Sequence, residues 1–165
     1  MAGLRNGKVV VSKDFEQIAE QGFGEKEGKV LVLAPFEALY LLEKKRIEVN
    51  KKNKKIEFAS LLKEFEKKNK RTRDLFLVFK DLRIAGYVAR DGKTNTPSFR
   101  VYARGARPEE EPARYLIWLV DKKTKLSVGE LEELINRAHA VRKKPLFAAV
   151  KGSTITYFKI DTSKF

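Results

Sequence analysis

The stretch FRVYARGARPEEEPARYLIWLV, Phe99–Val120, decides the fold of the second half of this chain. Its two apolar runs are rich in the β-branched and aromatic residues typical of strands, and they enclose a polar loop marked by glycine and proline. An exposable tyrosine, Tyr102, ends the first run, and Pro112 precedes the second. The pattern predicts two strands joined by this loop.

Further elements are predicted on both sides of this stretch. A strand at 86–92 precedes it, and a helix at 127–144 follows, where Ser127 and Glu130 form a capping-box pattern. Two closing strands with a turn at KGST complete the C-terminal half. They lie at 145–150 and 154–160.

The first half mixes short buried strands with amphipathic helices. Strands are predicted at 7–12 and 29–34, and helices at 35–47, 59–69 and 73–86, with Ser60 as a candidate N-cap. We therefore predict an α/β fold with two domains: an α+β N-terminal domain at 1–82, and a C-terminal domain at 83–165 that contains a mixed sheet and a helix.

The composition excludes several classes of protein. The chain has 165 residues, of which 42% are apolar, so it can form a packed core. It contains no cysteine, which excludes disulfides and thiolate zinc sites and favours an intracellular, cytoplasmic setting. No run reaches the roughly 20 apolar residues that a membrane span needs, and the first residues do not resemble a signal peptide.

Positive charge is the strongest compositional signal. Lysine and arginine total 36 against 22 acidic residues, which gives a net charge of +14 and favours a polyanionic partner such as nucleic acid. A heat-adapted, thermostable surface would explain many charges of both signs but not the surplus of one sign. Residues 44–73 contain 13 basic and 4 acidic residues. For this block, contact with nucleic acid and plain solvation are equally good interpretations.

Several motifs together resemble the archaeal tRNA-splicing endonuclease family. They are LAPFEALYLLEKKRIEV at 33–49 and then, in order, VY, an apolar YL run, VRKK and TY, within Val30–Ile160. The resemblance implies a restriction-endonuclease-like C-terminal domain. It also implies cleavage of precursor tRNA at bulge–helix–bulge sites, with 2′,3′-cyclic phosphate and 5′-hydroxyl products. No metal or cofactor is implied.

The family assigns its chemistry to a tyrosine, a histidine and a lysine. Tyr102 matches the tyrosine and Lys143 the lysine, although the adjacent Lys144 leaves that register open by one residue. Each also has a structural interpretation, because a strand-end tyrosine commonly packs its ring and a lysine suits a helix C-terminus. The position that corresponds to the histidine is Pro112, which has no titratable group.

No other residue is a convincing replacement for the missing acid. The only histidine, His139, lies on the predicted helix, where a half-buried structural role is expected. The three glutamates Glu109–Glu111 are expected to be exposed, with ordinary acidity. The segment before Tyr102 has also departed from the family's FG-x-D-F run and keeps only Phe99 of it.

The resemblance therefore favours a structural subunit that supports a catalytic endonuclease subunit in a heterotetramer. An active enzyme with an unorthodox acid and a stand-alone RNA-binding module stay open. Strand 154–160 is a candidate edge for pairing with the partner, and the acidic RPEEEP loop, Arg107–Pro112, is a candidate docking element. Candidate RNA contacts are Arg100, Arg104 and Arg114.

Overall fold

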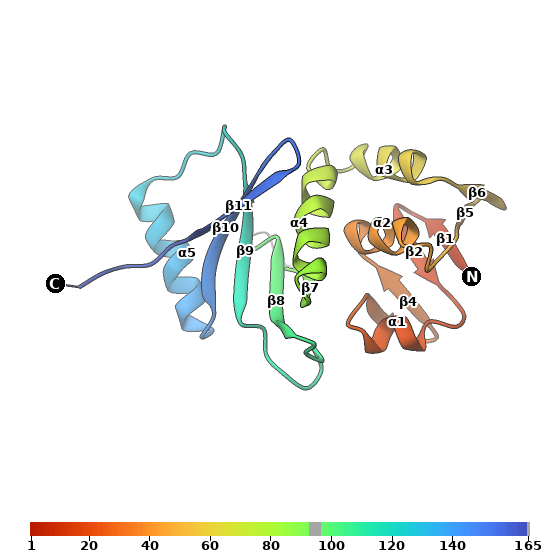
Figure 1. The fold of residues 1–165 in the computed structure, drawn as a ribbon, viewed down its shortest axis with the longest axis horizontal. Coiled ribbons are helices and arrows are strands. Elements are labelled where there is room, and N and C mark those ends of the chain that lie inside the picture. Colours follow the sequence, from red (N-terminus) through yellow and green to blue (C-terminus); the bar gives the residue numbers. More distant parts are fainter. Residues whose placement is uncertain (93–96, 165) are drawn as a thin grey trace. The chain divides into compact units, whose positions relative to one another are not determined.

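The computed structural model describes residues 1–92 and 97–164 and divides the chain into two compact units, Met1–Asp81 and Leu82–Phe165 (Figure 1). Each unit contains its own mixed sheet, and the described residues form five helices. The fold is therefore mixed α/β, as the sequence predicts.

The first unit is built on a six-stranded sheet with the order β3-β4-β2-β1-β5-β6. Most neighbouring strands in it are antiparallel, and β1 pairs with β5 in parallel. The elements in chain order are β1 (Ala2–Arg5), β2 (Lys8–Val11), α1 (Glu16–Glu20), β3 (Glu25–Glu27), β4 (Val30–Leu33), α2 (Pro35–Glu43), β5 (Val49–Lys51), β6 (Lys54–Ile56), α3 (Phe58–Glu66) and α4 (Thr72–Ile84), which continues past Asp81.

Helix α2 begins at a site that its own sequence prepares. Pro35 occupies the start of the helix, where no intrahelical N–H bond is lost. The buried carboxylate of Glu37 accepts hydrogen bonds from the backbone N–H groups of Ala34, at 2.8 Å, and Gly24, at 3.0 Å. One acid therefore joins the start of the helix to the loop that precedes β3.

An aromatic cluster forms part of the core of this unit. Phe79 of α4 is fully buried, and its ring centroid lies 4.9 Å from that of Phe36, 5.7 Å from that of Tyr40 and 6.2 Å from that of Phe23. Aromatic pairs at these separations stabilise beyond the area that they bury. The cluster holds α2 and α4 together within the unit.

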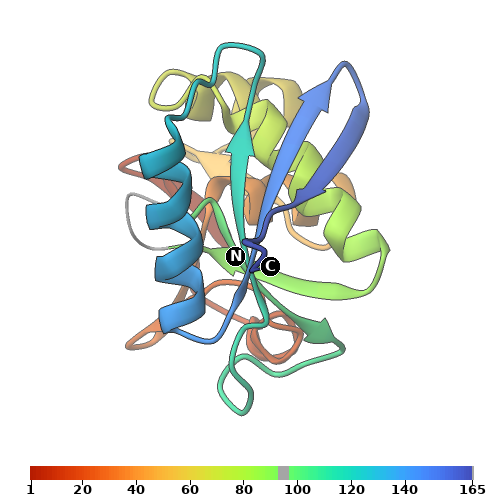
Figure 2. The same ribbon diagram turned by 90° about the vertical axis from the view of Figure 1, so that its left-hand side faces the viewer.

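The second unit is built on a five-stranded sheet with the order β11-β10-β9-β8-β7. Strands β9 and β10 are parallel neighbours and are connected through α5, which lies on one side of the sheet (Figure 2). The elements are β7 (Tyr87–Asp91), β8 (Phe99–Arg104), β9 (Tyr115–Val120), α5 (Val128–Ala140), β10 (Lys144–Lys151) and β11 (Thr154–Lys159).

Alternating residues give the two faces of this sheet different roles. On the face covered by α5, Leu116 and Trp118 pack with Ala138 of the helix. Phe99 and Ile117 point to the opposite face and are buried there. Tyr102 therefore belongs to a sheet whose central strands are buried on both faces.

The structure confirms the long predicted elements and corrects several local details. Ser127 and Glu130 form the predicted capping box, with N–H···O distances of 3.1 and 2.6 Å. Ser60 is not the N-cap of α3, which begins after Glu57. The sequence prediction missed β1, α1, β3, β5 and β6, which are all five residues or shorter.

Candidate functional site

Tyr102 lies near the end of β8 and is buried, with an exposed fraction of 4%. Its neighbours in a small apolar cluster are Val88, Ala106 and Ala113. The Arg100 guanidinium donates a hydrogen bond to the Tyr102 hydroxyl oxygen at 3.3 Å. The expectation of an exposable tyrosine is therefore wrong, because the loop before β9 folds back and covers the ring.

Pro112 lies beside this cluster, since the next residue, Ala113, belongs to it. Pro112 itself is exposed, at the end of a loop that is tightened by bonds from the N–H groups of Glu110 and Glu111 to the Arg107 carbonyl, at 2.9 and 3.1 Å. The residue that adjoins the Tyr102 cluster on this side therefore has no group that exchanges a proton.

The three glutamates of this loop are exposed, as the sequence predicts. Glu109 forms an ion pair with Arg90 of β7 at 3.1 Å, and Glu110 forms one with Arg107 at 3.4 Å. The Arg90 side chain is only 14% exposed, so this pair ties the loop to the sheet. Two of the acids are therefore engaged with arginines.

Lys143 follows α5 in a Schellman motif. The N–H of Lys143 donates to the Ala138 carbonyl at 2.8 Å, and the N–H of Arg142 donates to the His139 carbonyl at 2.9 Å. Arg142 adopts the left-handed conformation that this motif requires, with a φ of 57°. The motif ends the helix and leaves the Lys143 side chain half-buried, while Lys144 begins β10 and is exposed.

Backbone hydrogen bonds bring the three family positions to one end of the second sheet. The Arg114 N–H donates to the Val101 carbonyl at 2.8 Å, and the Lys144 N–H donates to the Arg114 carbonyl at 2.9 Å. Tyr102 adjoins Val101, and Lys143 adjoins Lys144. The predicted tyrosine, the proline position and the predicted lysine thus gather where β8, β9 and β10 lie side by side.

The three candidate RNA-binding arginines differ in how far they are already engaged. Arg100 is half-buried, and its Nε also donates to the Asp91 carbonyl at 2.9 Å. Arg104 is exposed and lies over the Tyr87 ring, 5.0 Å from its centroid. Arg114 is exposed at the start of β9. Arg104 and Arg114 are therefore the more accessible of the three.

His139 is exposed, which corrects the expectation that it is half-buried. Its Nε2 lies 3.5 Å from Oδ1 of Asp161, and the two side chains are 47% and 58% exposed. The histidine therefore belongs to a surface contact between α5 and the segment after β11. It has no packing role in the core.

Part of the departure from the FG-x-D-F run falls on residues 93–96, which lie outside the described residues. Within 1–92 and 97–164, no cluster of three or more histidine, aspartate or glutamate side chains is placed to hold a metal ion. The helices of the same ranges are all too short or too polar to cross a membrane.

The sequence predicted no particular role for Glu64 of α3. Its carboxylate lies 2.8 Å from Lys51 Nζ and 2.9 Å from Lys67 Nζ. Hydrogen bonds from Lys51 and then Lys67 lower the pKa of Glu64 from its usual 4.5 to about 2. The lysine-rich sequence on both sides of Glu64 was the available signal, but only the fold shows which lysines meet the acid.

Replacing Glu64 with glutamine is expected to change how stability depends on pH. The pKa of Glu64 is lower in the folded state, so its charge stabilises the fold above about pH 4.5, and this contribution is lost as the pH falls toward 2. The difference in unfolding free energy between wild type and E64Q should be constant above pH 5 and shrink at lower pH. Urea titrations at pH 7, 4 and 3 measure it, with E66Q as the control on the same helix. An equal difference at pH 7 and pH 3 would contradict this assignment.

Comparison with known families and proteins gives consistent matches. Residues 72–157 match the family described as tRNA intron endonuclease, catalytic C-terminal domain, and residues 1–62 match the tRNA intron endonuclease, N-terminal domain. A tRNA-splicing endonuclease of Pyrococcus furiosus is 34% identical over 146 residues, covering 88% of this chain and 84% of that protein. Those of Methanopyrus kandleri and Methanococcus maripaludis are 34% and 31% identical, covering 91% and 90% of this chain and 83% and 86% of theirs.

Proposed function

Because this chain belongs to the tRNA intron endonuclease family, we propose that it is the structural subunit of a tRNA-splicing endonuclease, working with a catalytic partner subunit on precursor tRNA. The observation that carries the proposal is Pro112. It lies beside the Tyr102 cluster, at the position where the resemblance places the histidine, and proline cannot donate a proton.

The reaction explains why this one position matters. The 2′-hydroxyl oxygen attacks the adjacent phosphorus and gives its proton to a base, while the bond from phosphorus to the 5′ oxygen breaks. An acid must protonate the departing 5′ oxygen, and a cation must stabilise the charge on the phosphoryl oxygens. Tyr102 and Lys143 hold two of the three family positions in this chain, and the acid is the missing part.

Three of the four other candidate acids are engaged elsewhere, and the fourth, Glu111, is exposed in the loop. His139 pairs with Asp161, and Glu109 and Glu110 pair with arginines on the surface. In this proposal Tyr102 is a packing residue and Lys143 is part of a helix end. When precursor tRNA is cleaved at bulge–helix–bulge sites, the acid that protonates the departing 5′ oxygen then belongs to the active site of the partner subunit.

Strand β11 supports the proposed assembly into a heterotetramer. Within the described part of the chain it pairs only with β10, so its outer edge is open for another strand. Phe158 of this strand is 49% exposed. An unpaired edge with an exposed aromatic side chain is suited to extending the sheet into a second subunit.

One observation favours a different function, an active endonuclease. The match to the catalytic domain spans residues 72–157, and Tyr102 and Lys143 are both present within it. In that case an acid other than histidine would protonate the departing oxygen. The net charge of +14 would suit a stand-alone RNA-binding module as well.

A cleavage assay distinguishes these functions. The purified chain is incubated with a labelled bulge–helix–bulge RNA, first alone and then with a catalytic subunit that carries the histidine. We expect no cleavage by the chain alone and cleavage by the mixture, at least 100-fold faster, since general acid–base catalysis contributes about 10²–10⁴-fold. Cleavage by the chain alone would establish the active enzyme. Tight binding with no cleavage in either sample would establish the RNA-binding module.

A further inference from the structure

The turns of two hairpins lie at the same end of the sheet in the first unit. In one hairpin Arg5 pairs with Lys8, and in the other Lys51 pairs with Lys54. The strands that lead into them, β1 and β5, are parallel neighbours. Because parallel strands point their carboxyl ends in the same direction, the two turns emerge together.

Both turns have two central residues in the left-handed conformation, as a type I′ turn requires. Asn6 and Gly7 have φ values of 50° and 74°, and Lys52 and Asn53 have values of 50° and 62°. Asparagine and glycine take this conformation readily, but for lysine it costs about 1 kcal/mol. The second turn therefore carries a lysine at its tip although the backbone favours a smaller residue.

A third basic segment, 67–71, joins these turns. Lys68 Nζ donates to the Asn6 carbonyl at 3.0 Å, so its side chain lies across the first turn. A Cβ atom at Gly7 would lie 2.4 Å from Lys68 Nζ, so glycine leaves the room that this side chain uses. Glu64 connects Lys67 to Lys51 of the second hairpin. The three segments therefore form one surface.

We call the segments 5–8, 51–54 and 67–71 the basic end. They contain nine basic residues and no acidic residue. Glu64 neutralises part of this charge. Arg5, Lys52 and Lys54 are exposed, and none of them forms an ion pair with any residue in the described ranges. Much of the positive charge of the basic end is thus available to a partner.

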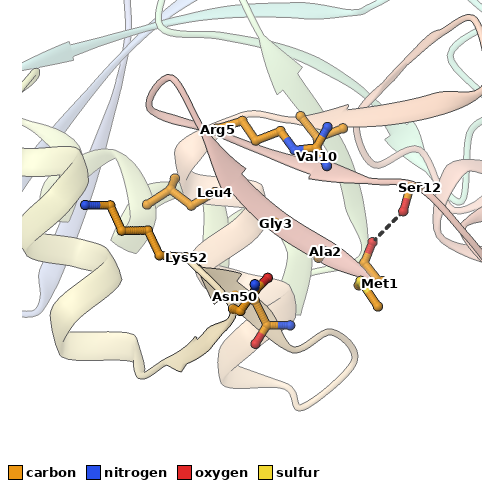
Figure 3. Close-up of a pocket in the computed structure, with 10 residues that line it drawn as sticks. Met1, Ala2, Gly3, Leu4, Arg5, Val10, Ser12, Asn50 and Lys52 are labelled. Atoms are coloured by element: carbon orange, nitrogen blue, oxygen red, sulfur yellow. Dashed lines mark hydrogen bonds between the residues drawn. The ribbon is translucent and has the colours of Figure 1, made fainter.

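A hollow of about 280 Å³ adjoins the basic end on the outward face of the sheet (Figure 3). Gly3, which has no side chain, lies in its floor between Val10 on one neighbouring strand and Asn50 on the other. Arg5 and Lys52 line it as well, and the Lys52 ammonium reaches away from it. The hollow therefore offers the Asn50 amide and the Arg5 guanidinium, which suit a sugar–phosphate chain.

The surface is poorly suited to a protein partner. Stable protein interfaces have an apolar centre from which lysine is depleted. Across Met1–Asp81, all of which is described, Met1 is the only exposed large apolar side chain. Met1 lines the hollow beside the basic end, and one such side chain does not form an apolar centre. A lysine-rich surface of this kind is typical of binding to nucleic-acid phosphates.

We propose that the basic end binds the phosphate backbone of RNA, as a site separate from the position of Tyr102 and Lys143. The choice of RNA as the polyanion rests on the proposed function. The contacts are electrostatic and do not read sequence, so they hold the substrate without selecting the cleavage position.

The test compares two triple variants that remove equal charge. R5Q/K52Q/K54Q removes three free charges from the basic end. K13Q/K26Q/K29Q is the matched control on the same sheet: Lys13 follows β2, and Lys29 precedes β4. The antiparallel pairing of β2 with β1 and with β4 places these two at the opposite end. The probe is a fluorescein-labelled RNA duplex of about 16 base pairs without bulges, and circular dichroism checks that each variant is folded.

We expect R5Q/K52Q/K54Q to bind the duplex roughly tenfold more weakly at 0.1 M salt, and the slope of log K against log salt to fall by about 2 to 3. The control should change affinity less than about twofold. Equal weakening in both variants would show that only net charge matters and would overturn the proposal. The proposal would also be overturned if wild type did not bind the duplex and R5Q/K52Q/K54Q assembled more weakly than wild type with the catalytic subunit. That result would assign the basic end to a protein partner.

The two proposals fail in distinguishable ways. If wild type does not enable cleavage by a catalytic subunit, the proposed role as a structural subunit is ruled out. The duplex measurement still tests whether the basic end binds RNA. If wild type enables cleavage and the two triple variants bind the duplex equally well, only the proposal that the basic end binds RNA is ruled out.

Discussion

Replacing Tyr102 with alanine is expected to destabilise the second unit by about 3 kcal/mol, whereas Tyr102→Phe should cost about 1 kcal/mol or less. Tyr102 is only 4% exposed and packs among Val88, Ala106 and Ala113, so loss of its ring leaves a cavity that these small side chains cannot fill. Phenylalanine keeps the ring and loses only the hydrogen bond from Arg100 at 3.3 Å.

The chain carries its own probe for this measurement. Trp118 is the only tryptophan and lies in β9 of the same unit, so its fluorescence follows unfolding of this unit in denaturant. A loss of less than about 1 kcal/mol in Tyr102→Ala would show that the ring is not a packing element.

Tyr102→Phe also tests the role of the hydroxyl in catalysis. In the mixture with a catalytic subunit, we expect the cleavage rate to change less than twofold, because in the proposed assembly the catalytic tyrosine belongs to the partner. If Tyr102 were the general base, removal of its hydroxyl would instead lower the cleavage rate by about 10²–10⁴-fold. A loss of that size would make Tyr102 catalytic and overturn the proposed structural role.

The second large effect is expected at Glu37. Glu37→Ala should destabilise the first unit by about 3 kcal/mol or more, because it leaves the N–H groups of Gly24 and Ala34 without their acceptor. Glu37→Gln keeps one carbonyl oxygen and the side-chain volume, so we expect a loss of about 1–2 kcal/mol.

Hydrogen exchange of the α2 amides measures this change locally, and Trp118 fluorescence provides the comparison in the other unit. Protection of α2 that is the same in wild type and Glu37→Ala would show that the carboxylate does not hold the start of the helix. A larger loss in the glutamine variant than in the alanine variant would also contradict the assigned hydrogen bonds.

The long elements could be predicted because each is encoded locally. Apolar runs such as Tyr115–Val120 form strands that are buried on both faces, and the Ser127 capping box satisfies its own helix end. The short strands could not be predicted in this way. Glu25–Glu27 and Lys54–Ile56 consist mainly of charged residues, and only pairing with a neighbouring strand makes them extended.

The candidate site was predictable in position but not in environment. The order of the motifs indicated that Tyr102, Pro112 and Lys143 belong together, and backbone bonds around Arg114 bring their segments to one sheet end. Burial of Tyr102 depends on the fold of the loop before Ala113, which has no local signal. Glu37 was missed for a related reason: helical periodicity places a charged residue outside, while this acid is buried for its hydrogen bonds.

The parallel pairing of β9 with β10 has a consequence for synthesis on the ribosome. The strand Tyr115–Val120 is translated before α5 and before its second sheet neighbour, Lys144–Lys151. Until that neighbour is made, one edge of a highly apolar strand stays open to other nascent chains, and such edges are sites of aggregation. The length of the charged helix and loop between the two strands therefore determines how long this edge stays unpaired during translation.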